Sequence, residues 1–98
     1  MAFYDPKKEE SKSQPFLFTL STCVHCKGAK KLLKDLDMPF HYVDVDQLSD
    51  GEMNEALEEM SGYNPAQTFP TIIGAGKVIV GFRPDDIEQM VAKLKSAK

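Results

Sequence analysis

The stretch from residue 16 to residue 45 restricts the fold more than any other part of this chain. Phe16–Leu20 is a short apolar and aromatic run, which is typical of a buried strand. Apolar residues then recur at helical spacing, and Phe40–Val45 alternates as a second strand. Two strands joined by a helix form a βαβ unit with a right-handed crossover, so the pattern predicts an α/β fold. The apolar stripe of the predicted helix consists of Cys26, Ala29, Leu32, Leu33 and Leu36.

The next part of the chain predicts a second helix and a hairpin. Ser49 and Glu52 fit a capping box at the start of this helix, and Gly62 ends it. Its apolar stripe consists of Met53, Ala56, Leu57 and Met60. Gly62–Gln67 is a loop, after which Thr71–Ile73 and Val78–Val80 are short strands on either side of a four-residue turn.

A third helix begins at Pro84, because proline suits the first helical position and Asp85 and Asp86 suit the first turn. Its apolar stripe consists of Ile87, Met90, Val91 and Leu94. The predicted order of elements is therefore β-α-β-α-β-β-α, with a four-stranded mixed sheet and helices on both of its faces.

The composition limits the location and the partners of the protein. Residues 1–14 are rich in charge, Ser and Pro, which predicts a disordered tail before a single domain at 15–98. The tail has no apolar segment typical of a secretory signal, and no run approaches the roughly 20 apolar residues of a membrane span. The net charge of −3 disfavours nucleic-acid binding. We expect a cytoplasmic monomer that binds neither nucleic acid nor membranes.

The chain contains two cysteines, Cys23 and Cys26, at the start of the first predicted helix. Free backbone N–H groups and the helix dipole stabilise a thiolate there, so Cys23 is the expected nucleophile. Cys26 lies on the apolar stripe and is expected to be buried and to resolve the mixed disulfide. His25 is expected to stabilise the Cys23 thiolate further and to make the disulfide more oxidising. The C-x-x-C spacing of the two cysteines predicts redox chemistry, in which neither cysteine binds a metal ion.

Other interpretations of the same residues stay open at this point. Cys23, His25 and Cys26 with His41 supply the four ligands of a tetrahedral zinc site. An iron–sulfur cluster or a redox-regulated adaptor without turnover are further alternatives. The lysines of the first helix, Lys27, Lys30, Lys31 and Lys34, are expected on its exposed face, either simply solvated or as a basic rim that attracts an acidic partner.

Three motifs resemble the glutaredoxins and glutaredoxin-like redoxins: C-V-H-C at Cys23–Cys26, T-F-P at Thr68–Pro70 and G-F-R-P-D-D at Gly81–Asp86. The resemblance covers about residues 15–95 and implies a thioredoxin fold with a cis Pro70 beside the cysteines. It also implies that the backbone of Phe69 pairs with a substrate chain or with glutathione. The activity that the resemblance implies is dithiol–disulfide oxidoreduction of protein or glutathione mixed disulfides.

The same resemblance implies a site for substrate or glutathione at Thr22, Phe69, Pro70, Gly81, Phe82, Asp85 and Asp86. The chain departs from the family pattern at Leu20, where a lysine is usual, and at Phe82, where a glycine is usual. Asp85 and Asp86 match the acids that hold the glutathione amino group, or they only cap the third helix. No tightly bound cofactor is implied. The electron donor is either glutathione or a flavoprotein reductase of the thioredoxin-reductase type.

Overall fold

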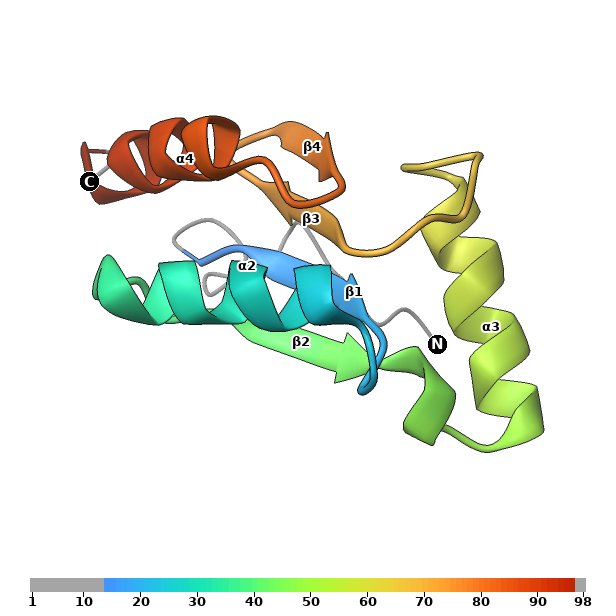
Figure 1. Cartoon of the computed structure of the whole chain (residues 1–98). Coiled ribbons are helices and arrows are strands. Elements are labelled where there is room, and N and C mark those ends of the chain that lie inside the picture. The colour runs from blue at the N-terminus through green and yellow to red at the C-terminus, as the bar shows by residue number, and fades with distance from the viewer. Residues whose placement is uncertain (1–13, 97–98) are drawn as a thin grey trace.

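Four strands form one mixed sheet in the order β2-β1-β3-β4 (Figure 1). The structure is a computed structural model that describes residues 14–96. Strand β1 (Phe16–Thr19) pairs in parallel with β2 (His41–Asp44) and antiparallel with β3 (Thr71–Gly74). Strand β4 (Lys77–Val80) pairs antiparallel with β3. The predicted tail at 1–14 lies, apart from its last residue, outside the described residues.

Three helices cover the two faces of this sheet. Helices α2 (Val24–Asp35) and α4 (Pro84–Ser96) pack side by side on one face, as Figure 1 shows. Helix α3 (Asp50–Ser61) packs on the opposite face, after a short 3-10 helix, η1 (Val45–Gln47). This arrangement confirms the predicted order β-α-β-α-β-β-α and is that of a thioredoxin fold.

The core lies in two parts, one on each face of the sheet. Successive residues of a strand point to opposite faces, so Leu17 joins the cluster under α2 and α4 while Phe18 joins the cluster under α3. Every predicted apolar position of the helices is buried or half-buried. The cluster on the first face contains Leu17, Ala29, Leu33, Met38, Ile72, Ile79, Ile87, Met90, Val91 and Leu94. The cluster on the second face contains Phe18, Val45, Ala56, Met60 and Ile73.

Local sequence signals explain where the elements begin and turn. Oγ of Ser49 accepts a hydrogen bond from the backbone N–H of Glu52 at 3.4 Å and donates one to Oε1 of Glu52 at 2.9 Å. This confirms the predicted cap of α3. The hairpin turn consists of Ala75 and Gly76, with φ of 51° and 73°, which is typical of a two-residue turn with left-handed residues. The turn is therefore shorter than the four residues predicted.

Two boundaries differ from the prediction for a physical reason. Strand β2 ends at Asp44 rather than Val45, because the chain turns into η1 and buries Val45 against α3. Strand β1 ends at Thr19, and Leu20 already belongs to the turn that leads to α2. Within residues 14–96, no helix combines the length and the apolar character that a membrane crossing requires.

Candidate active site

Cys23 is the residue that caps the amino end of α2. Its backbone N–H donates to the carbonyl oxygen of Leu20 at 3.2 Å, and its own carbonyl accepts from Lys27 at 3.1 Å. Its backbone is extended, with φ of −82° and ψ of 118°, as expected at a helix cap. Its Sγ atom accepts a hydrogen bond from the N–H of Cys26 at 3.3 Å. Cys23 is half-buried, and its sulfur lies where free N–H groups of the first turn stabilise negative charge.

Cys26 lies on the inner side of the first turn of α2 and is completely buried. Both cysteines are free thiols in this structure. Burial, together with the side-chain hydrogen bond to Cys23, raises the pKa of Cys26 to about 12. Cys26 is therefore protonated at neutral pH, and access from solvent favours reaction at Cys23.

The loop before β3 lies at the same end of the sheet as the cysteines. Phe18 of β1 pairs with Thr71 of β3. Cys23 follows Phe18 closely along the chain, and Pro70 directly precedes Thr71. The peptide bond between Phe69 and Pro70 is cis, as the family resemblance implied. The carbonyl oxygen of Pro70 accepts the N–H of Gly81 at 2.8 Å, which joins this loop to the segment after β4.

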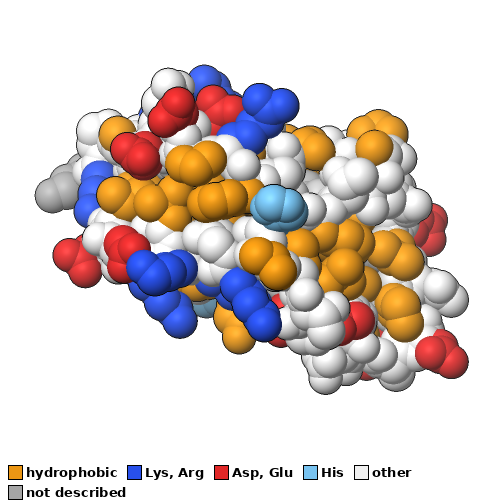
Figure 2. All heavy atoms as spheres, viewed as in Figure 1, with side chains coloured by type: hydrophobic (Ala, Val, Ile, Leu, Met, Phe, Trp, Pro, Cys, Tyr) orange, Lys and Arg blue, Asp and Glu red, His pale blue; other side chains and the backbone are white. Residues whose placement is uncertain are grey.

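The side chain of Phe82 lies against α2. A Cβ atom added to Gly28 would be 3.3 Å from Cε2 and 3.4 Å from Cζ of Phe82, so the ring covers the helix at this glycine. Phe82 keeps 36% of its surface exposed, and Val24 in the first turn keeps 78%. Figure 2 shows apolar side chains over the region between α2 and α4, with both basic and acidic side chains on either side. The surface over these two helices is therefore apolar, and its border carries charges of both signs.

The other expected site residues are exposed, apart from the half-buried Gly81. Asp85 and Asp86 lie in the first turn of α4 and line, with residues 82–84, an open hollow of about 320 Å³. Thr22 lies in the turn before Cys23, and His25 lies in the first turn of α2; both side chains are exposed. Gly81 has a φ of 87°, in the region that favours glycine.

The structure does not bring His41 to the cysteines. His41 is the first residue of β2 and is paired with Phe16, the first residue of the parallel strand β1, whereas Cys23 follows the last residue of β1. The four-ligand zinc site considered from the sequence is therefore not formed. Within residues 14–96, no group of three or more His, Cys, Asp or Glu side chains could hold a metal ion.

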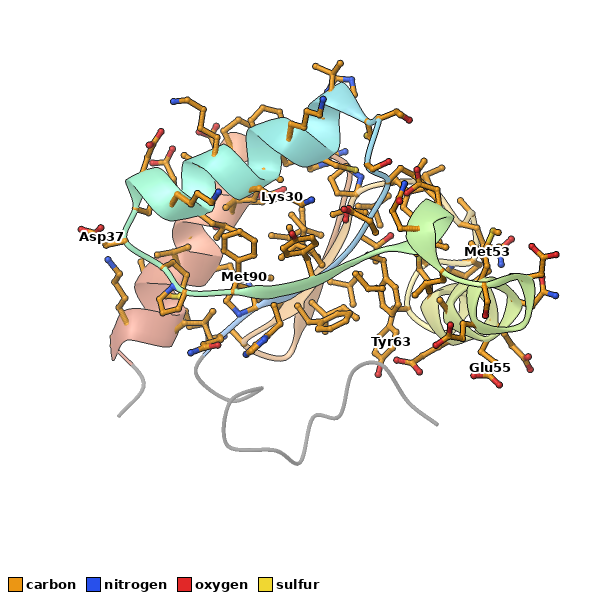
Figure 3. All side chains as sticks on the ribbon, turned by 90° about the horizontal axis from the view of Figure 1, so that it is seen from below. Lys30, Asp37, Met53, Glu55, Tyr63 and Met90 are labelled. Atoms are coloured by element: carbon orange, nitrogen blue, oxygen red, sulfur yellow. The ribbon has the colours of Figure 1, made fainter. Side chains whose placement is uncertain are left out.

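The expectation that Lys30 faces solvent with the other lysines is wrong. Its Nζ atom pairs with Oδ1 of Asp44 at 3.0 Å, and its side chain is only 18% exposed. Figure 3 shows Lys30 between α2 and the strands. Lys30 follows Cys26 by four residues, and this spacing was the signal in the sequence that places both on one helix face.

Two further contacts that the sequence did not reveal fix the loops of the site. The carboxylate of Asp46 accepts hydrogen bonds from the N–H of Ser21 at 2.9 Å and from its hydroxyl at 2.5 Å. These contacts lower the pKa of Asp46, with the hydroxyl of Ser21 as the largest cause. The buried Asn64 donates from Nδ2 to Thr68 and Thr71, which brackets the loop that contains Pro70.

Comparisons with known proteins identify the family of this chain. The glutaredoxin family model matches residues 16–79. A glutaredoxin of Ricinus communis is 34% identical over 82 residues, which are 83% of this chain and 78% of the relative. The crystal structure of Methanosarcina acetivorans methanoredoxin superposes with a TM-score of 0.76 and 42% identity, over 82% of this chain and 85% of that one.

A third similar protein is the glutaredoxin-like NrdH-redoxin of Escherichia coli, described as having a thioredoxin-like activity profile. It superposes with a TM-score of 0.61 and 27% identity, over 79% of this chain and 93% of that one. Both the family model and the relative at 34% identity cover most of the described sheet and helices. The chain therefore belongs to the glutaredoxin family and is a thiol–disulfide oxidoreductase.

Proposed function

We propose that the protein reduces disulfides by a dithiol mechanism in which Cys23 attacks and Cys26 resolves. The observation that carries this proposal is the unequal environment of the two sulfurs. Cys23 is half-buried and its Sγ accepts a hydrogen bond from the N–H of Cys26, whereas Cys26 is buried with a raised pKa. A thiolate reacts and a thiol does not, so substrate is attacked at Cys23.

The reaction has two exchange steps. In the first, the Cys23 thiolate attacks a disulfide R–S–S–R′, which gives the mixed disulfide Cys23–S–S–R and releases R′–S⁻. In the second, Cys26 loses its proton and attacks Sγ of Cys23, which gives the Cys23–Cys26 disulfide and releases R–S⁻. Reduction of the Cys23–Cys26 disulfide by the electron donor completes the cycle.

The remaining site residues have proposed roles around this sulfur pair. The backbone of Phe69, held by the cis bond to Pro70, pairs with the extended substrate chain or with glutathione. Thr22 and Gly81 border the same end of the sheet, and His25 tunes the thiolate of Cys23 from the first turn of α2. Asp85 and Asp86 at the amino end of α4 are candidates to hold an ammonium group of the ligand.

The electron donor is glutathione or a flavoprotein reductase. The position of Phe82 favours the reductase. Glutaredoxins work with glutathione, and Asp85 and Asp86 keep an anchor for its ammonium group. The ring of Phe82 covers α2 at Gly28, and Phe82 stands where the family usually has a glycine that lets backbone approach the ligand. We therefore propose weak glutathione binding and a reductase of the thioredoxin-reductase type, with Phe82 and Arg83 as its docking surface. The thioredoxin-like activity described for the Escherichia coli redoxin supports this choice.

Three broader expectations stay proposals. They are a single domain at 15–98, a monomeric state and a cytoplasmic location. The substrates that we propose are proteins with transient catalytic or redox-sensing disulfides, since a reducing cytoplasm contains few other disulfides.

Turnover of a small model disulfide, bis(2-hydroxyethyl) disulfide, tests the proposed mechanism. With dithiothreitol as reductant, Cys23→Ser should abolish turnover. In Cys26→Ser, mass spectrometry should detect a long-lived mixed disulfide on Cys23, because the resolving thiol is missing. Turnover by Cys23→Ser at the rate of the parent protein would disprove the assigned roles.

A further inference from the structure

An ion pair lies between the catalytic helix and the sheet. Nζ of Lys30 on α2 is 3.0 Å from Oδ1 of Asp44 on β2, and the two side chains are 18% and 21% exposed. The ammonium group also lies 3.8 Å from the centre of the Tyr42 ring, at cation–π distance. Oγ1 of the buried Thr19 donates to the same Asp44 oxygen at 2.5 Å. Asp44 and Tyr42 of β2 therefore hold the Lys30 ammonium in one place, and Thr19 of β1 in turn holds Asp44.

A second ion pair of α2 is much more exposed than the Lys30–Asp44 pair. Lys31 pairs with Asp35 at 3.1 Å, and these side chains are 78% and 59% exposed, as an ordinary surface pair would be. Partial burial of two charges costs solvation free energy that an exposed pair does not lose. We therefore expect the Lys30–Asp44 pair to have a functional role that offsets this cost.

Cys26 lies one helical turn before Lys30. Residues four apart share a helix face, so both project from α2 toward the sheet. Burial first, and then the hydrogen bond to Cys23, raise the pKa of Cys26, whereas the charge of Lys30 lowers it. The other titratable groups on this side are Cys23 on α2 and Asp44 and Tyr42 on β2; the core residues of β3 and α4 there are apolar.

We propose that Lys30 is a positioning residue for the second exchange step, where its ammonium group supports the thiolate of Cys26. This inference rests on the proposed function. In that step the Cys26 thiol loses its proton and its sulfur bonds to Sγ of Cys23, while the bond from Cys23 to the substrate sulfur breaks. The departing substrate thiolate takes up one proton, so the products are the Cys23–Cys26 disulfide and a free thiol. Asp44 keeps the ammonium group of Lys30 in place during this step.

The first test measures the titration of Cys26 alone, without turnover. In a Cys23→Ser background, the absorbance of the thiolate near 240 nm is followed against pH. Lys30→Met should raise the pKa of Cys26 by on the order of one unit, and Lys30→Arg should restore it. Asp44→Asn should shift this pKa in the opposite direction, because it removes a negative charge. Lys31→Met is the matched control and should leave the titration unchanged.

The second test measures the resolution step itself. A mixed disulfide on Cys23 is formed with a chromogenic aromatic thiol, and release of that thiol is timed from pH 6 to 9. Each unit by which the pKa of Cys26 rises lowers the thiolate fraction tenfold but increases nucleophilicity about threefold. Lys30→Met should therefore slow release by about threefold at each pH, with Lys30→Arg and Lys31→Met near the parent rate.

The tests distinguish a loss of folding, a failure of the inference about Lys30 and a failure of the proposed dithiol mechanism. If Lys30→Met destabilises the fold, the double variant Lys30→Met/Asp44→Asn removes both charges and should still release thiol more slowly than Asp44→Asn. In the Cys23→Ser background, a pKa of Cys26 that is the same with and without the Lys30→Met substitution would overturn the inference. Absence of any thiol release by the parent protein would instead count against the proposed dithiol mechanism.

Discussion

The backbone N–H of Cys26 donates a hydrogen bond to Sγ of Cys23 at 3.3 Å, while the sulfur of Cys26 is fully buried. The backbone of Cys26 thus stabilises negative charge on Cys23, whereas burial disfavours negative charge on the sulfur of Cys26 itself. Helix geometry explains this asymmetry, because the cap position is exposed to free N–H groups and the third position after it faces the core.

The first prediction is that alkylation distinguishes the two cysteines. At pH 7, iodoacetamide should modify Cys23 in the Cys26→Ser variant at least about tenfold faster than Cys26 in the Cys23→Ser variant. The reason is that a thiol with a pKa of about 12 contains very little thiolate at neutral pH. Rates are measured by mass spectrometry from pH 5 to 9. Faster modification of Cys26 would reverse the assigned roles.

The second prediction concerns stability at alkaline pH. The pKa of Cys26 rises from 9.0 to about 12 on folding, so the folded state keeps its proton where the unfolded state loses it. The stabilisation is complete below pH 9 and falls as the pH rises toward 12, by at most about 1.4 kcal/mol of unfolding free energy per pH unit. Urea unfolding at pH 8, 9, 10 and 10.5 measures this slope.

Cys26→Ala should reduce the slope, and Cys23→Ala is its matched control. Part of the slope should persist in Cys26→Ala, because burial and the nearby charge of Glu59 also raise the pKa of Tyr63. An unchanged slope in Cys26→Ala would show that the thiol of Cys26 is not the group that titrates.

The third prediction concerns the contact that fixes the turn before Cys23. Asp46→Ala should increase hydrogen exchange at the amide of Ser21 roughly two- to tenfold, because that N–H loses its acceptor. Gln47→Ala removes a neutral contact to the same hydroxyl and should have a smaller effect. NMR-detected exchange at constant pH measures both.

The direction of the pKa shift of Asp46 determines how this contact depends on acid pH. The pKa of Asp46 is lowered in the folded protein, so its contribution is present above the ordinary value of 3.8 and is lost as the pH falls through the folded value. The amide of Ser21 should therefore lose its protection in acid in the parent protein but not in Asp46→Ala, which lacks it at any pH. Equal protection in both proteins at neutral pH would contradict this role.

The sequence predicted those parts of the fold that depend on neighbours along the chain. Ser49 caps α3, and Pro84 begins α4, because capping and proline geometry act within one turn. The exposure of Lys30 was predicted wrongly, because its partner Asp44 comes from β2 and helical spacing alone does not show which strand faces a residue. Contacts between distant segments required the structure.

The contact between Phe82 and Gly28 illustrates the same limit. A glycine inside a helix costs about 1 kcal/mol relative to alanine, so Gly28 was a sign that something packs closely there. The identity of the packing side chain could not be inferred, because Phe82 lies more than fifty residues later in the chain. The cysteine motif, by contrast, is contained in one helical turn, and its position at the start of α2 was predicted correctly.

The fourth prediction is that His25 raises the reduction potential of the disulfide. An imidazole beside the Cys23 thiolate stabilises the reduced form, so His25→Gln should make the disulfide harder to reduce. An interaction of about 1 to 2 kcal/mol corresponds to about 20 to 40 mV for this two-electron couple. Equilibration with dithiothreitol buffers measures the potential. His41→Gln, on β2 at the other end of the sheet, is the control, and equal potentials in both variants would leave His25 without a tuning role.

The fifth prediction concerns the electron donor and compares two coupled NADPH assays, one with glutathione and glutathione reductase and one with thioredoxin reductase. Phe82→Gly should lower the rate with thioredoxin reductase, because the apolar anchor is lost from the docking surface. The same change should increase the rate with glutathione, because it opens α2 at Gly28. Val78→Ala, an exposed apolar position on β4, is the control and should change neither rate.

Leu20→Lys tests the glutathione side of this prediction. Leu20 cannot pair with a glutathione carboxylate, and a hydrogen bond to a charged group is worth about 1.5 to 3 kcal/mol, so the added lysine should strengthen glutathione binding about tenfold. Leu20 also packs against the core cluster under α3, so the unfolding free energy of the variant is measured alongside. Efficient glutathione turnover by the parent protein, unchanged in both Phe82→Gly and Leu20→Lys, would contradict the prediction. Glutathione would then be the donor, and Phe82 would only cover the catalytic helix.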